Sequence, residues 1–196
     1  MPKPKRNVRI RRILFAVLTW IGISTLAVGL SKAQAPAQSP ATARRAAPAA
    51  APQVYATLAQ LMKGILYPSS NVIFAAQSEN PADVKPAQDP STATNPLANS
   101  YGKWEAVENS GLAIAEAANL LILPGRKCSN GLDVPLKNPD WAKFVQGLRE
   151  AGMTAYKAAQ SKNQDNILMA ADTLSTACAN CHDKYREKAK LADRCK

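Results

Sequence analysis

The sequence of 196 residues contains one histidine, His182, and no acidic residue among its first 35 positions. With a single histidine and no group of side chains in a catalytic arrangement, the chain is not expected to be an enzyme. No stretch alternates apolar and polar residues as a β-strand does, and no segment repeats at the period of a solenoid. These absences argue against a β-fold, a repeat protein and a turnover enzyme.

The net charge of +11 does not indicate a nucleic-acid partner once it is located along the chain. Removing the seven basic residues of the first 35 leaves 18 Lys and Arg against 14 Asp and Glu. The basic excess therefore belongs mainly to the N-terminus, and no binding surface for nucleic acid is expected. The seven are Lys3, Lys5, Arg6, Arg9, Arg11, Arg12 and Lys32.

The first 35 residues have the layout of an export segment. A basic head precedes an apolar run over residues 13–30, and small residues follow up to Ala35. This order is typical of a secretory signal peptide, cut after Ala33 or Ala35. It also fits a retained membrane anchor, because the 18 residues of the run come close to the roughly 20 that span a bilayer. Both alternatives predict a periplasmic protein, and in the second residues 13–30 tether it to the membrane.

The remainder is predicted to be a linker, residues 36–53, followed by one folded domain, residues 54–196. The linker is mostly Ala, Pro, Gln and Ser and has almost nothing to bury. In the domain, apolar residues recur three and four apart in four segments, at 54–76, 101–123, 139–159 and 163–189. Four amphipathic segments predict an all-α, antiparallel up-down-up-down four-helix bundle.

Three local features qualify this prediction. Pro68 should kink or interrupt the first helix, because proline lacks a backbone donor and crowds the preceding turn. Asn138 is expected to cap the third helix. Residues 77–100, with four prolines, form a loop that is long for a compact domain, so it is either an elaboration with a role or a flexible insertion.

The segment Cys178-Ala179-Asn180-Cys181-His182 carries the chemistry. A zinc site needs three or four protein ligands and would have to recruit a distant cysteine. A thioredoxin-like pair expects a βαβ context, and a disulfide between the two cysteines is awkward inside a helix. C-x-x-C-H is the attachment signature of c-type haem, in which the two thiols add to the haem vinyl groups and the histidine binds the iron. Haem attachment outside the cytoplasm agrees with the export segment.

With this motif near the C-terminus, on the last helix of a predicted bundle, the chain resembles the class II cytochromes c, the cytochrome c′ family. The stretch CANCHDKYR matches the family's CxxCHxxYR ending, and LMKGILYPSS, NLLILPGR and GMTAYKAAQ also resemble it. The resemblance covers roughly residues 54–190 and implies one covalent haem c on the last helix. Because dimers are common in the family, it leaves a homodimer open.

The family divides by what faces the iron from the other side. Some members leave that position empty beneath an apolar residue and bind NO or CO, whereas others supply a methionine from the first helix and carry electrons. Met62 lies eight residues past Val54, and His182 lies about seven before the end of the last helix. At about 1.5 Å per residue, both are roughly 10–12 Å from the same end of an antiparallel bundle. Met153 and Met169 lie toward the other end.

Met62 is therefore the candidate distal ligand, although a methionine on a leucine-rich stripe is also common core filling. Leu58 and Leu61 are expected to pack on the haem, and Leu61 becomes the apolar cap if Met62 points away. On the proximal side, Arg186 follows His182 by one turn and is a candidate partner for a haem propionate. Tyr185 is expected to pack near the haem edge.

Cys128 and Cys195 remain. In the predicted topology the loop between the second and third helices is at the same end as the C-terminus, and the compartment is oxidising, so a disulfide between them is plausible. The alternative is two free thiols.

We therefore expect an exported monohaem c-type cytochrome that carries single electrons between redox partner proteins of the cell envelope, with His182 and Met62 as iron ligands. Two alternatives stay open at this point. One is a five-coordinate haem protein that binds NO or CO. The other is a helical envelope module without haem.

Overall fold

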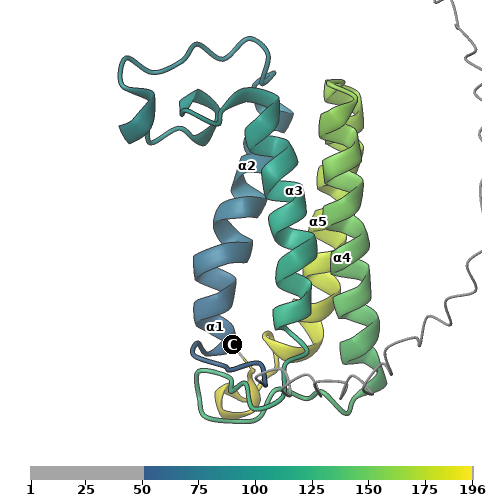
Figure 1. Ribbon diagram of the computed structural model, residues 1–196. Coiled ribbons are helices and arrows are strands. Elements are labelled where there is room, and N and C mark those ends of the chain that lie inside the picture. The colour runs from purple at the N-terminus through teal and green to yellow at the C-terminus, as the bar shows by residue number, and fades with distance from the viewer. Residues whose placement is uncertain (1–50, 196) are drawn as a thin grey trace, which may run out of the picture. The chain divides into compact units, whose positions relative to one another are not determined.

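The computed structural model describes residues 51–195 (Figure 1). The predicted export segment, residues 1–35, and nearly all of the predicted linker, residues 36–53, lie outside this range. Between residues 51 and 195 every regular element is a helix and no β-strand forms. The all-α prediction is confirmed. None of the helices in this range combines the length and the apolar character needed to cross a bilayer.

The first helical segment is built from three consecutive pieces, α1 (Leu58–Leu61), the π-helical turn η1 (Met62–Leu66) and α2 (Tyr67–Ser78). Thr57 begins it with a capping box, because its side chain accepts from the Gln60 backbone while the Gln60 side chain accepts from the Thr57 backbone. Pro68 was expected to kink or interrupt this segment. The segment does not break, but its α-helix is interrupted by the π-helical turn η1, which directly precedes α2 and its Pro68.

Three long helices follow: α3 (Lys103–Leu120), α4 (Pro139–Gln160) and α5 (Gln164–Tyr185). The predicted starts at residues 101, 139 and 163 agree to within two residues. Asn163 caps α5 by accepting from the next backbone donors. Asn138 occupies the N-cap position of α4 but its side chain makes no capping bond; it donates to Tyr185 Oη instead, at 3.4 Å.

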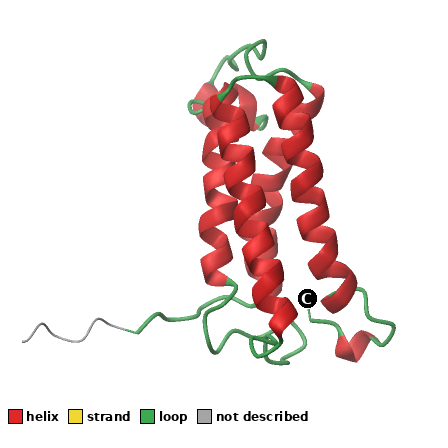
Figure 2. Ribbon diagram, turned by 90° about the vertical axis from the view of Figure 1, so that its right-hand side faces the viewer, coloured by secondary structure: helices red, strands yellow, loops and turns green. Residues whose placement is uncertain are grey.

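The long helices lie side by side (Figures 1 and 2). In the described chain α3 packs on α4, α4 on α5, and α2 on both α3 and α5. Helices α3 and α4 approach closely: a Cβ on Gly152 would lie 2.7 Å from the Ala115 backbone nitrogen and 2.8 Å from the Gly111 carbonyl oxygen. At this contact a residue with a side chain would collide with the backbone of α3.

The segment 77–100 packs into the fold through buried side chains. It contains two 3₁₀ turns, η2 (Pro90–Thr92) and η3 (Pro96–Ala98), and buries Val84 and Leu97. Ala87 donates its backbone N–H to the Ala98 carbonyl at 3.0 Å. Figure 1 shows this segment at the end of α2 and α3 that is remote from the C-terminus.

Candidate cofactor site

A cavity of about 620 Å³ opens between the first helical segment and helices α4 and α5. Ligand pockets in proteins usually enclose about 300–1,000 Å³ and are lined mainly by apolar side chains. This cavity fits both properties, with leucine, valine and aromatic side chains from three helices forming most of its wall. It is large enough for an organic cofactor.

Helix α5 contributes the residues of the C-x-x-C-H motif. Cys178, Cys181, His182 and Tyr185 all line the cavity. Their spacing of three and four residues places them on one face of α5, as the helical period requires. Both cysteines are free and half-buried, and His182 is half-buried.

Burial controls the protonation of these groups. It raises the pKa of the Cys178 thiol, against a smaller lowering by the nearby Arg186 guanidinium. It raises the pKa of Cys181 to about 11, with a further contribution from Cys178. Burial, followed by Arg186, lowers the pKa of His182 from its ordinary value of 6.5. At neutral pH both sulfurs therefore stay protonated and the imidazole is neutral, which is the form that binds a metal.

Met62 lines the same cavity from the first helical segment, together with Leu58 and Leu66. Its side chain is half-buried. The expectation that Met62 and His182 reach one site from two helices agrees with this placement. Seven of the eight predicted site residues line the cavity.

Leu61 is the exception. It is buried, at 5% exposure, yet it is not among the residues that line the cavity. Because Leu61 precedes Met62 by one position, it points about 100° away from Met62 around the helix. Leu66, one turn past Met62, lines the cavity, whereas Leu61 does not, so the contact expected between Leu61 and a cofactor stays a prediction.

Helix α4 supplies a wall that the sequence did not identify as part of a site. Trp141, Phe144, Val145 and Leu148 line the cavity. Trp141, Val145 and Leu148 lie on the apolar stripe of α4, and nothing in the sequence distinguishes them from ordinary core residues. Only their position could have indicated a role in the site, because Trp141 and Phe144 lie near the start of α4, at the end of the fold where α5 ends.

Two cationic side chains, Lys63 and Arg186, lie at the edge of the cavity. Arg186 is exposed and forms an ion pair with Glu187. Tyr185 beside it is 4% exposed, and its ring meets Trp141 edge to face. Arg186 can therefore reach an anionic group at the mouth, while Tyr185 forms part of the apolar wall.

A disulfide joins Cys128, in the loop between α3 and α4, to Cys195 near the C-terminus, with their Cα atoms 5.0 Å apart. The pairing suggested by the topology is present. Cys195 also lines the cavity, and its backbone N–H donates to the Tyr185 carbonyl at 2.9 Å. The disulfide thus holds the residues after α5 against the cavity wall.

Arg126 anchors the start of the first helical segment to the same loop. It is 4% exposed, and its guanidinium donates to the Ala56 carbonyl at 2.6 Å and to the Leu120 carbonyl at 3.0 Å. Leu58 N–H donates to the Lys127 carbonyl at 2.8 Å. Desolvation lowers the pKa of Arg126, but its two carbonyl partners compensate the burial of the charge. These bonds tie the start of α1 to the end of α3 and to the loop that follows it.

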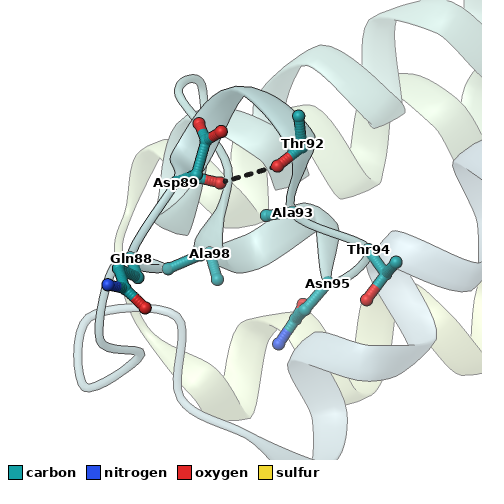
Figure 3. Close-up of a pocket in the computed structure, with 8 residues that line it drawn as sticks. Gln88, Asp89, Thr92, Ala93, Thr94, Asn95 and Ala98 are labelled. Atoms are coloured by element: carbon teal, nitrogen blue, oxygen red, sulfur yellow. Dashed lines mark hydrogen bonds between the residues drawn. The ribbon is translucent and has the colours of Figure 1, made fainter.

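A second hollow, of about 400 Å³, lies within the segment 77–100 (Figure 3). It is lined by backbone and small polar groups, and the Thr92 hydroxyl donates to the Asp89 carbonyl across its rim. It contains no cysteine, histidine or methionine. The cavity between the helices therefore has the stronger claim to be the functional site.

The described residues hold no cluster of three or more His, Cys, Asp or Glu side chains that could bind a metal ion by themselves. Comparison with protein-family models, with curated proteins and with solved structures gave no match to this chain.

Proposed function

We propose that this chain is an exported, periplasmic monohaem c-type cytochrome that carries single electrons between redox proteins of the cell envelope. In this proposal Cys178 and Cys181 hold the haem through thioether bonds, and His182 and Met62 bind its iron. The observation that supports it best is the shared cavity. Two free thiols and the sole histidine line its α5 side, and Met62 lines the side formed by the first helical segment.

The residues present fit a covalently held haem. Attachment needs two unpaired cysteines in reach of one apolar cavity, and the other two cysteines are already committed to a disulfide. The neutral form of His182 is the one that ligates iron. Leu58, Leu66 and the aromatic side chains of α4 give the cavity an apolar wall, while Arg186 and Lys63 can pair with anionic groups at its edge.

The proposal includes the finer description of the fold. The described helices would form an antiparallel up-down-up-down bundle of the cytochrome c′ kind, with the haem on α5. The packing of α2 on α3 and α5, and of α4 on α3 and α5, is compatible with such a bundle.

Met62 distinguishes electron transfer from gas binding. The haem would supply a one-electron couple, and thioether ligation raises the potential of such a couple. If Met62 and His182 both bound the iron, no coordination position would stay open to a substrate or a gas. The proposed protein is therefore a carrier and not an enzyme.

The first experiment is expression with and without the c-type maturation machinery. We expect a haem that stays with the protein through acidic organic extraction, and a stoichiometry of one per chain. The Cys178→Ala, Cys181→Ala double variant should lose the covalent haem, whereas the Cys128→Ser, Cys195→Ser variant should keep it. Protein that matures without any haem would overturn the proposal and favour a helical envelope module.

The second experiment addresses the distal ligand. The haem-loaded protein is expected to be low-spin, and Met62→Ala should make it high-spin and able to bind CO when reduced. Met169→Ala is the matched control, because Met169 is 64% exposed and does not line the cavity. A wild-type protein that is already high-spin and binds CO would replace the electron carrier with the gas-binding alternative.

A further inference from the structure

The cavity residues of the first helical segment follow an unusual spacing. Five of them are each four positions apart, with three more beside them. The five are Leu58, Met62, Leu66, Ser70 and Phe74, and the three are Ala59, Lys63 and Tyr67.

A uniform α-helix cannot keep such a series on one face. Each residue advances an α-helix by about 100°, so a step of four overshoots a full turn by about 40°. Over the four steps from Leu58 to Phe74 the drift would reach about 160°. One end of the series would then point away from the cavity.

The π-helical turn η1 (Met62–Leu66) removes this drift. At its end the Tyr67 N–H donates to the Met62 carbonyl, five residues back. A single π turn takes up one residue more than an α turn, so the net rotation between Leu58 and Phe74 falls to about 60°. All five side chains can then line one cavity.

Pro68 explains why the turn forms at this place. Proline has no N–H to donate to the carbonyl four residues back, and its ring collides with that carbonyl in an α-helix. The carbonyl concerned is that of Gly64, at the centre of η1. A wider turn moves this carbonyl away from the ring, and a Cβ added at Gly64 would meet no other atom within 4 Å. The Pro68 ring is exposed, so it makes no core contact that would serve as a separate reason for its presence.

We propose that Pro68 is a positioning residue for Met62, acting through the π turn that keeps Met62 facing the cavity. The inference rests on the proposed function for what Met62 does there. Without Pro68 the segment is free to become a regular α-helix. α2 buries three side chains, Val72, Ile73 and Ala76, whereas α1 buries two, Leu58 and Leu61. The shorter α1 end would therefore rotate by about one residue, or 100°, with loss of the bond from Leu58 N–H to the Lys127 carbonyl. Met62 would leave the cavity.

The haem-loaded protein provides the first test. Pro68→Ala is expected to lose the low-spin spectrum, although no cavity residue has been changed. Deleting Gly64 in the Pro68→Ala background removes the extra residue, so an all-α segment again places the series within about 60°. This double variant should regain the low-spin spectrum. Pro139→Ala is the control, because Pro139 occupies the start of α4, where no N–H is needed, and the spectrum should not change.

The second test needs no haem. In the full chain purified without haem, peroxide oxidation followed by peptide mass spectrometry should show Met62 protected relative to exposed Met169. Pro68→Ala should lose this protection, and the Gly64 deletion should restore it. If this pattern appears but no haem attaches, the proposed function fails and the positioning role stands. If Pro68→Ala keeps both the wild-type spectrum and the wild-type protection, the positioning role is wrong.

Discussion

The Trp141 ring on α4 meets the Tyr185 ring on α5 edge to face, with centroids 5.1 Å apart and planes at 70°. Both side chains line the cavity, and both are almost completely buried. Trp141 Nε1 also donates to the Leu121 carbonyl at 3.2 Å, which fixes the indole to the end of α3. This pair therefore connects three helices at the cavity wall.

We expect Tyr185→Ala to lower the free energy of unfolding by about 3–5 kcal/mol, because a buried aromatic ring and its edge-to-face partner are lost together. Tyr185→Phe should cost much less, because it keeps the ring and loses only a 3.4 Å hydrogen bond from Asn138. Urea unfolding of the two variants gives the comparison. Equal losses in both would show that the hydroxyl, and not the ring, is the stabilising group.

The contact between α3 and α4 leads to a second prediction. Gly152→Ala would place a methyl group 2.7 Å from a backbone nitrogen of α3, and backbone cannot move aside as a flexible side chain can. We expect a loss of about 1–3 kcal/mol. Gly147 lies on the same helix with nothing within 4 Å of the added Cβ, so Gly147→Ala should instead stabilise by about 0.5–1 kcal/mol. Thermal unfolding of both variants checks the opposite signs; a stable Gly152→Ala protein would contradict the close packing.

The helices and the α5 face of the site could be predicted from sequence because both depend on local periodicity. A cysteine three residues after another and a histidine next to it must share a helical face once α5 forms. The level of Met62 was predicted by counting residues along helices assumed to be antiparallel, and Met62 and His182 line one cavity.

What could not be predicted depends on tertiary contacts. Trp141 and Phe144 have the chemistry of core residues, so only the packed structure shows that they enclose a cavity. Leu61 was assigned to the site because it lies on the apolar stripe of the predicted helix. Its side chain points about 100° away from that of Met62 and does not line the cavity. The spacing of apolar residues could not predict the π turn, although Pro68 predicted a kink or an interruption in the first helix. Segment 77–100 is polar in composition, and only the structure shows that its Val84 and Leu97 are buried.

An ion pair between Asp140 and Lys184 joins the first turn of α4 to the last turn of α5. The hydrogen bond from Lys184, and then its charge, lower the pKa of Asp140 below 3.8. The same bond raises the pKa of Lys184 above 10.5. Because the pKa of Asp140 is lowered on folding, this group stabilises the fold above pH 3.8, and the stabilisation is lost as the pH falls through the lowered pKa. Because the pKa of Lys184 is raised on folding, this group stabilises the fold below pH 10.5, and the stabilisation is lost as the pH rises through the raised pKa.

The pair should therefore contribute only between these limits, and only weakly because both groups are exposed. We expect the urea midpoints of wild type and Asp140→Asn to differ near neutral pH and to converge once the pH falls below the lowered pKa of Asp140. Lys184→Gln should reproduce the shift, and the double variant should show no further loss near neutral pH. Additive losses in the double variant would mean that the two residues act independently.

The disulfide between Cys128 and Cys195 closes a loop with a sequence separation of 67 residues. In the chain-entropy description a loop of this length is worth about 4 kcal/mol, because the unfolded chain is restricted. Cys128→Ser, Cys195→Ser should lose up to about this amount in urea unfolding. Reductant added to wild-type protein should have the same effect and should add nothing to the variant. In haem-loaded protein, reductant cannot cleave thioethers at Cys178 and Cys181, so the haem should remain attached while stability falls.

Because Cys195 lines the cavity and its N–H bonds to the Tyr185 carbonyl, the Cys128→Ser, Cys195→Ser variant should also exchange the amide hydrogens at the end of α5 faster. Unchanged exchange there, with the expected loss of stability, would confine the disulfide to an effect on the unfolded chain.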